Sequence, residues 1–355
     1  MTKHLKLLPF IFIFTILKAF PQEEGESQNI NINRTITTPL FESEELLEIS
    51  LKFDITTLKR KRSETDYLDA VISYVSDYGD TVFRNIKVRA RGNFRRNYCD
   101  FPPVHLNFKV KDTISGNFSG IDKIKLVPYC KPAYEDYLLR EYLVYKLYNI
   151  LTDYSLRVRL LRITFINTAR TEAKPLTQFG FVIEPIPVFE KRTGSTEVKT
   201  KMAQRLVRQE MMDRVAIFNY MIGNTDWSVP AMHNVIVFSQ PHTGPYHLGT
   251  IVPYDFDFSG IVNAEYAHPF ESLPIKSIRE RLYLGLCRSE ESFKKSLDEF
   301  NRKKEDFYNL INSFPYLRVN SKKDMILYLK SFYDDFDKRN TIIYNLVNNC
   351  KLFNL

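Results

Sequence analysis

Two segments, TVFRNIKVRARG (residues 81–92) and VHLNFKV (residues 104–110), decide how the first half of this chain is expected to fold. In the second segment apolar and polar residues alternate, with one face formed by Val104, Leu106 and Phe108 and the other by His105, Asn107 and Lys109. Successive side chains of a β-strand point to opposite faces, so this alternation is typical of a strand with one buried face. Both segments are therefore predicted to be strands of a sheet that exposes basic residues.

Further strands and one helix are predicted around these two segments. The other strands have similar alternation and read LEISLKFDI (47–55), YLDAVISYV (67–75), IDKIKLV (121–127), LRVRLLRITFIN (156–167) and FGFVIEPIPVFEKRTG (179–194). The period changes within residues 131–151, where leucines recur every four residues, which indicates an amphipathic helix. The expected arrangement is a meander of about five strands, then one helix, then two more strands that end at Pro185 and Pro187.

The second half of the chain is expected to be mainly helical. Helical patterns cover residues 199–223, 289–314 and 321–350, and the first of them ends at Gly223. Between them, NVIVFSQ (234–240) and YHLGTIVPYDFDF (246–258) flank the turn-like sequence PHTG, which predicts a hairpin. An Asp/Asn-containing segment precedes this hairpin and an Asp-rich segment ends it.

The order of these parts predicts an α+β protein with a bilobal protein-kinase-like fold. In this prediction residues 45–184 form a β-rich N-lobe with one helix. Residues 185–355 form a mainly helical C-lobe that carries the catalytic and metal-binding loops. Residues 21–44 are polar without periodicity and are expected to be a linker.

Residues 1–20 are predicted to be a cleaved export signal, so the protein is expected to be secreted or periplasmic. Lys3 and Lys6 precede a short apolar run, LLPFIFIFTIL (7–17). The run is too short to span the hydrocarbon core of a bilayer as a helix, and no later segment is long and apolar enough to do so. No transmembrane span is therefore expected in the mature chain. The oligomeric state is left open.

The net charge of +8 suits a partner that carries phosphates or another anionic surface, although a solvated basic surface explains it equally well. No stripe of aromatic and basic residues accompanies the charge, so nucleic acid is not an expected partner.

The four cysteines, Cys99, Cys130, Cys287 and Cys350, lack the spacing of a metal site. Export to an oxidising compartment permits up to two disulfides with three possible pairings, and four buried thiols are the alternative. Cys99 and Cys130 each follow a tyrosine near the end of a predicted strand segment. We expect these two cysteines to form a disulfide.

Two aromatic-flanked segments concentrate the carboxylates of interest, GNTDWSVPAMHN (223–234) and VPYDFDFSG (252–260). The aromatic neighbours indicate that Asp226, Asp255 and Asp257 are partly buried. Because a buried carboxylate without a partner is costly, something must neutralise these groups. The candidates are a metal cation, an arginine or lysine, or a run of backbone donors. Alternatively, Asp226 caps a helix or turn, and Asp255 and Asp257 lie in a solvated loop.

From about residue 45 to 275 the chain resembles the CotH family of spore-coat and secreted kinase-like proteins. The resemblance lies in the Arg-Gly-Asn strand region (VRARGNFRRNYCDFPPVHLNFK), the helix DYLLREYLVYKLYNIL, the strand FGFVIE, and the blocks NTDWSVPAMHN and VPYDFDFSG. The last two blocks also resemble the active-site loops of HipA-type kinases. The resemblance implies a kinase that transfers the γ-phosphoryl of ATP to a protein hydroxyl, on itself or on a secreted partner, with Mg²⁺ or Mn²⁺.

The resemblance also implies roles for the carboxylates. Asp255 would be the main metal ligand, helped by Asp257 if the chain bends there and by the amide oxygen of Asn234. Asp226 would orient the acceptor hydroxyl. His233 is expected to be a structural neighbour of Asn234 rather than a base.

Binding of ATP is expected to depend on the predicted sheet. Arg91 and either Lys109 or Lys125 would contact the phosphates, with Lys125 pairing with Glu141 of the helix. Glu184 would sit at the hinge where the adenine binds. In the alternative, RARGNFRR is a basic edge strand whose Arg89, Arg95 and Arg96 face water, and Lys125 and Glu184 are simply exposed.

Two departures from ordinary kinases leave other functions open. Asn234 follows Asp226 by eight residues instead of five, and no glycine-rich phosphate loop is present. These departures favour, as an alternative, an inactive secreted pseudokinase or a surface structural protein. A metal-dependent glycosyltransferase that uses the Asp-Phe-Asp sequence is a second alternative, but such enzymes need βαβ units before that motif.

Overall fold

The computed structural model describes residues 38–76, 79–108, 116–239, 249–338 and 341–353. The predicted export signal, most of the predicted linker and Lys109 lie outside these residues.

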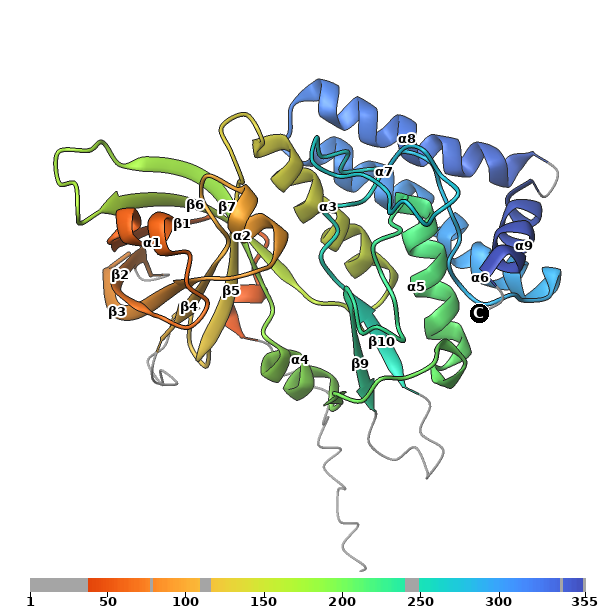
Figure 1. The fold of residues 1–355 in the computed structure, drawn as a ribbon, viewed down its shortest axis with the longest axis horizontal. Helices are drawn as coiled ribbons and strands as arrows, with labels where there is room; N and C mark the ends of the chain where they lie inside the picture. The colour runs from red at the N-terminus through yellow and green to blue at the C-terminus, as the bar shows by residue number, and fades with distance from the viewer. Residues whose placement is uncertain (1–37, 77–78, 109–115, 240–248, 339–340, 354–355) are drawn as a thin grey trace, which may run out of the picture. The chain divides into compact units, whose positions relative to one another are not determined.

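Seven strands form a closed barrel in the order β1-β2-β3-β4-β5-β7-β6 (Figure 1). The strands are β1 (Leu47–Phe53), β2 (Leu68–Val75), β3 (Thr81–Ala90), β4 (Val104–Asn107), β5 (Lys123–Pro128), β6 (Val158–Asn167) and β7 (Leu176–Ile183). Neighbouring strands are antiparallel except for β1 and β6, whose parallel pairing closes the barrel. The segments predicted from alternation are therefore strands as expected.

The interior of the barrel is filled by the apolar half of each alternating pattern. Its fully buried side chains include Leu51, Ile72, Val88, Val104, Leu106, Leu126 and Ile163. The polar half of the pattern faces outward, so Arg89 of β3, His105 of β4 and Lys125 of β5 stand in register across three neighbouring strands. One outer face of the barrel is therefore basic.

Helices join the barrel to a second hydrophobic core. α1 (Ile55–Lys61) and α2 (Phe94–Tyr98) are short insertions between barrel strands. α3 (Glu135–Leu151) contacts β6 and β7 as well as α7 (Lys304–Ser313), and it contributes many side chains to the second core. In Figure 1, α3 lies between the barrel and the later helices.

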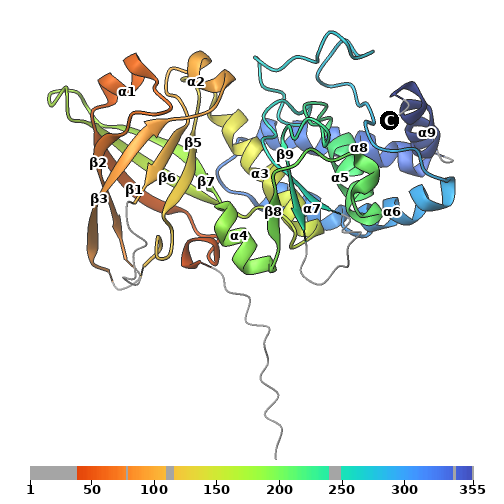
Figure 2. The same ribbon diagram turned by 60° about the horizontal axis from the view of Figure 1, so that its bottom comes forward.

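The later part of the chain combines a small sheet with helices. β9 (Val235–Ser239) pairs antiparallel with β10 (Thr250–Pro253), which confirms the predicted hairpin, and β8 (Thr196–Val198) adds an edge strand that was not predicted. Figure 2 shows α4 (Ile186–Thr193) at the end of β7, next to β8. The remaining helices are α5 (Gln209–Ile222), α6 (Glu290–Arg302), α8 (Val319–Asp337) and α9 (Thr341–Phe353), with single 3₁₀ turns at Pro39–Phe41 and Gln204–Leu206.

The predicted bilobal kinase-like fold, with one helix in a β-rich N-lobe, is wrong. The β-region is a closed barrel rather than an open lobe, it carries α1 and α2 in addition to α3, and the described residues belong to one compact unit. Alternation predicts a strand but not its partner, so the parallel pairing of β1 with β6 has no signature in the sequence. The short helices α1 and α2 are also too short to leave a helical period.

Both pairs of cysteines are disulfide-bonded. The expected Cys99–Cys130 bond is confirmed, and Cys287 pairs with Cys350. The first bond ties the end of α2 to the segment after β5, and the second ties the segment before α6 to α9. Among the described residues no helix combines the length and the apolar character needed to cross a bilayer.

Candidate active site

The two acidic segments of the sequence lie side by side. α5 ends at Ile222 and is capped by Gly223, whose φ of 67° is a left-handed conformation that glycine adopts without steric cost. The chain then forms a loop, residues Asn224–Asn234, which we call the Asp226 loop. A β-bridge joins Asn224 to Ser259, and the Tyr254 amide donates a hydrogen bond to the Asn234 carbonyl at 3.0 Å. These contacts place the Asp226 loop against the segment that holds Asp255 and Asp257.

Arg95 neutralises the second acidic segment. Its guanidinium donates two hydrogen bonds to Glu141, at 2.8 and 3.1 Å, and one to Asp255 at 2.7 Å. Its Nε lies 3.2 Å from Oδ2 of Asp257. Glu141, Asp255 and Asp257 come from α3 and from the segment after β10, and we call them the acidic cluster. An arginine, rather than backbone donors alone, therefore satisfies the carboxylates that the sequence marked as buried.

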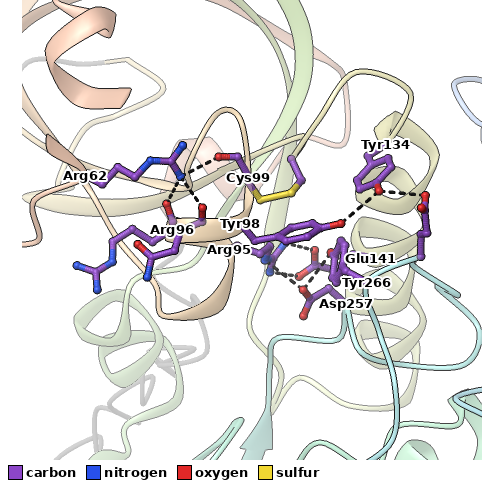
Figure 3. The surroundings of a disulfide bond; sticks show 12 residues. Arg62, Arg95, Arg96, Tyr98, Cys99, Tyr134, Glu141, Asp257 and Tyr266 are labelled. Atoms are coloured by element: carbon purple, nitrogen blue, oxygen red, sulfur yellow. Dashed lines mark hydrogen bonds and ion pairs between the residues drawn. A yellow bond between two sulfur atoms is a disulfide. The ribbon is translucent and has the colours of Figure 1, made fainter. Parts of the chain in front are cut away.

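α2 carries Arg95 although none of its own residues is fully buried. The end of α2 is fixed by the Cys99–Cys130 disulfide and by Arg62, whose guanidinium donates to the carbonyls of Arg96, Asn97 and Cys99 (Figure 3). These contacts satisfy carbonyl groups that a short helix leaves without partners. The disulfide and Arg62 thus hold in place the helix that delivers Arg95.

Sequence reasoning missed Arg95, which was expected to be at most a water-facing residue of a basic strand. The available signal was the adjacent pair of basic residues close to a cysteine. That signal cannot distinguish Arg95, with a side chain only 13% exposed, from Arg96, which is bound to Glu64 at 3.3 Å.

The carboxyls of the acidic cluster differ in their protonation behaviour. Burial raises the pKa of Asp257 well above its usual value, and the nearby charges of Asp255 and Glu141 add to this effect, while Arg95 opposes it. Burial also raises the pKa of Glu141. For Asp255 the opposite holds, because Arg95 and Arg91 outweigh burial and lower its pKa. One arginine thus faces three carboxyls, of which Asp255 most strongly favours the charged form.

A cavity of about 430 Å³ adjoins Asp255, between the barrel and the segment that enters α4. Its lining includes the largely apolar residues Val127, Tyr145, Leu156, Ile183, Ile186 and Val188. It also includes the polar residues Arg91, His105, Lys123, Lys125 and Asp255. Burial and the neighbouring Arg89 and Arg91 lower the pKa of His105 to about 4, so its imidazole is neutral at pH 7.

Arg91 and Lys125 are half-buried at this cavity and form no salt bridge among the described residues. Burial lowers the pKa of both groups, although the nearby Asp255 carboxylate acts to raise it. The predicted pairing of Lys125 with Glu141 is not found, because Arg95 binds the Glu141 carboxylate. The Lys125 ammonium instead lies 5.3 Å from the centre of the Tyr254 ring. Arg91 and Lys125 therefore present two cations to the cavity.

Glu184 lines the cavity at the expected hinge, but its carboxylate is engaged elsewhere. Arg192 donates to both carboxylate oxygens, at 2.9 and 2.8 Å, and the Arg157 amide donates to one of them at 3.1 Å. The side chain is buried, so its role in the fold is to anchor α4 beside β6. Among the described residues, the backbone amide of Ile186 at the start of α4 has no hydrogen-bond acceptor, and Ile186 is one of the residues that line the cavity.

The Asp226 loop is held by its own residues. His233 Nε2 lies 2.6 Å from Oδ1 of Asp226, and the Asn234 side-chain amide donates to Oδ2 at 3.0 Å. The Asp226 amide in turn donates to the Asn224 side chain at 3.0 Å. Asp226 and Asn234 therefore do meet across eight residues, but as hydrogen-bond partners of each other.

A metal ion fits this site in part. Carboxylate oxygens of Glu141, Asp255 and Asp257 lie within 4.8 Å of one another, as the ligands of one cation do, yet Arg95 already contacts all three residues. Asp257 is directed toward Arg95 and toward the Tyr266 hydroxyl, which donates to it at 3.1 Å. Of the three, Asp255 alone lines the cavity, with 35% of its side chain exposed. A cation held at the cavity would therefore use Asp255.

No protein-family model matches the chain, and no curated protein is significantly similar to it. The resemblance to the CotH family therefore stays a prediction.

Proposed function

We propose that this protein is an ATP-dependent phosphotransferase that binds its nucleotide in the cavity beside Asp255. The observation that carries the proposal is the pair of half-buried cations, Arg91 and Lys125, which line the cavity and form no salt bridge among the described residues. The nearby Asp255 already pairs with Arg95, so a bound anion would compensate these two desolvated cations, and guanidinium and ammonium groups are the usual phosphate binders of proteins. The volume of the cavity is within the range of small-molecule and cofactor sites.

The lining of the cavity offers both kinds of contact that a nucleotide needs. Apolar side chains such as Val127, Leu156 and Ile183 would pack against the base, and the backbone amide of Ile186 would be a donor for a ring nitrogen. Arg91 and Lys125 would bind the phosphates, and Asp255 would hold Mg²⁺ or Mn²⁺. When bound, such a cation neutralises phosphate oxygens during transfer.

The acceptor that we propose is a protein hydroxyl, on the protein itself or on a secreted partner. It would approach Asp255 past the Asp226 loop, whose last residue, Asn234, accepts a hydrogen bond from the Tyr254 amide. The two disulfides support export, because disulfides persist in oxidising compartments. A secreted or periplasmic location, as predicted from the sequence, suits the proposed function and does not depend on a kinase-like fold.

One observation favours nucleotide binding without transfer as a second candidate. The Arg95 guanidinium contacts Asp255 at 2.7 Å, so an internal cation already occupies one position around the proposed metal ligand. A secreted pseudokinase would retain the cavity and lack the transfer step. A glycosyltransferase is less well supported, because the described barrel strands before Asp255 are antiparallel apart from the β1–β6 pair and form no βαβ units.

Replacing the cavity cations tests the proposal directly. We expect Arg91→Met and Lys125→Met each to weaken ATP binding about 10- to 100-fold, since a hydrogen bond to a charged group contributes about 1.5–3 kcal/mol. Calorimetric titration with ATP and Mg²⁺ or Mn²⁺ measures the affinity. Lys87→Met is the matched control, because Lys87 lies on β3 outside the cavity and pairs with Asp69.

Transfer itself is measured with γ-labelled ATP. Asp255→Ala is expected to abolish the metal-dependent part of nucleotide binding, whereas Asp226→Ala is expected to leave binding intact and lower turnover. If the wild type binds ATP but transfers no more label than Asp226→Ala, the pseudokinase candidate replaces the enzyme. If the wild type binds no nucleotide, the cavity has another ligand and the proposal is wrong.

A further inference from the structure

The Asp226 carboxylate is poorly placed to meet an acceptor directly. Both of its oxygens are engaged, Oδ1 with His233 and Oδ2 with Asn234. Only 16% of its side chain is exposed, against 51% of the His233 side chain. The member of this pair that solvent and an incoming hydroxyl can reach is therefore the imidazole.

The backbone around His233 holds the imidazole in this position. Two reciprocal hydrogen bonds of 2.9 Å join the backbones of Ser228 and His233 and hold these two parts of the loop together. Met232, directly before His233, has a φ of 53°, a left-handed conformation that a side chain of this size rarely adopts. Directly after His233, the Asn234 carbonyl accepts from the Tyr254 amide, one residue before Asp255. His233 is thus fixed beside the segment that borders the cavity.

Stability alone does not account for this arrangement. A histidine–carboxylate pair whose imidazole is half-exposed adds little to the free energy of folding. A left-handed methionine reduces it, and backbone conformations of this kind persist where the surrounding structure enforces them, often at functional sites. The pair is therefore better explained by what the exposed imidazole does than by what it contributes to the fold.

We infer that His233 is the general base of the proposed phosphotransferase and that Asp226 is its positioning residue; this inference rests on the proposed function. With Nε2–H donating to Asp226, the lone pair of Nδ1 is available. As the acceptor oxygen bonds to the γ-phosphorus, its proton passes to Nδ1 of His233. The bond between the γ-phosphorus and the β,γ-bridging oxygen breaks, and its electron pair leaves with the nucleoside diphosphate. Asp226 stabilises the resulting imidazolium, which returns its proton to water.

The test uses the full chain with ATP, Mg²⁺ and label transfer. His233→Ala is expected to lower kcat by about 10²–10⁴-fold, the usual contribution of a general base, while the Kd for ATP is unchanged. Added imidazole is expected to restore part of kcat, because the vacated position is open to solvent. Asp226→Asn is also expected to lower kcat, but imidazole cannot rescue it because the native ring is still present. His268→Ala, at an exposed histidine outside the loop, is the control.

A second variant separates catalysis from structure. His233→Gln retains a side-chain amide that can donate to Asp226 but has no basic nitrogen, so we expect it to be as inactive as His233→Ala. Full activity of His233→Gln, or a large loss in Asp226→Asn with none in His233→Ala, would overturn the inference and return the role of base to Asp226. Either result leaves the proposed function intact, since the wild type still transfers label. A wild type without transfer overturns both.

Discussion

The acidic cluster and the Asp226 loop lie next to each other but are built in opposite ways. The acidic cluster gathers side chains from α2, α3 and the segment after β10, so Arg95 and Asp255 meet across 160 residues. The Asp226 loop satisfies its carboxylate with residues at most eight positions away. The cluster therefore depends on the whole fold, while the loop depends mainly on its own hydrogen bonds.

Because of this difference, substitutions in the two parts of the site are expected to affect different properties of the protein. Arg95, Glu141 and Asp257 are largely buried, so a change there leaves a charge without a partner in a region of low dielectric. His233 is half-exposed, so a change there is compensated by water. We expect substitutions in the acidic cluster to lower the free energy of unfolding and substitutions in the loop to lower turnover.

The largest effect is expected from Arg95→Met. This variant removes the guanidinium that contacts all three carboxyls of the acidic cluster, including the charge-favouring Asp255, and it should destabilise the protein by about 3–5 kcal/mol. Urea unfolding followed by the fluorescence of the single tryptophan, Trp227, measures the change. Arg96→Met is the matched control and should cost less than about 1 kcal/mol, because Arg96 only pairs with the partly exposed Glu64. Equal stability of the two variants would show that the cluster does not depend on Arg95.

Removal of the Cys99–Cys130 disulfide is expected to have the next largest effect. Replacing both cysteines by serine opens a loop with a sequence separation of 31 residues and should cost roughly 3–4 kcal/mol in the chain-entropy description. It should also weaken ATP binding, because the bond anchors α2 and hence Arg95.

The other disulfide provides the comparison for this prediction. Cys287 and Cys350 are 63 residues apart, so their replacement by serine should cost a similar free energy of unfolding. Neither residue lies at α2 or lines the cavity, and ATP affinity should therefore be unchanged at temperatures where the variant is folded. An equal loss of ATP affinity in both double variants would argue against a specific role for the α2 anchor.

A smaller, pH-dependent effect is expected within the acidic cluster. The raised pKa of Asp257 means that its contribution to stability is fully present below its ordinary pKa and is lost as the pH rises through the folded-state value. Asparagine cannot ionise, so the stability of Asp257→Asn relative to wild type should improve between pH 4 and pH 8. The expected change is about 1 kcal/mol or more, the equivalent of one pKa unit. Chemical unfolding at both pH values measures it.

Asp255→Asn should respond to pH in the opposite sense. The pKa of Asp255 is lowered, so its contribution is present above its ordinary value and is lost as the pH falls through the folded-state value. The variant should therefore be less stable than wild type at pH 7 and approach it near pH 3. The same pH trend in both variants would contradict the division of charge within the cluster.

The smallest effect on stability is expected from His233→Gln. An exposed hydrogen-bonded pair contributes about 1 kcal/mol or less, so the urea midpoint should barely move. A loss comparable to that of Arg95→Met would mean that the Asp226 loop is as dependent on tertiary structure as the acidic cluster. Urea unfolding of the two variants side by side decides between these outcomes.

The sequence by itself predicted the local elements of this protein. Alternation located the barrel strands, the leucine period located α3, and the spacing around PHTG located the β9–β10 hairpin. The tyrosine–cysteine pairs led to the Cys99–Cys130 bond, and the aromatic neighbours of the aspartates marked the segments that meet at the site. All of these features depend on residues close together in the chain, or on chemistry that only a few residues can perform.

Tertiary structure alone decided which distant residues meet. An alternating pattern predicts which face of a strand is buried but not which strand it pairs with. The pairing of β1 with β6 that closes the barrel therefore could not be predicted from the sequence. A buried carboxylate likewise requires a partner, but the sequence does not indicate which residue that is. In the folded protein Arg95 pairs with Glu141 and Arg192 pairs with Glu184, while Lys125 lines the cavity. Charge pairing depends on distances of a few ångströms between atoms that the chain brings together from remote positions, and residue types along the sequence do not encode those distances.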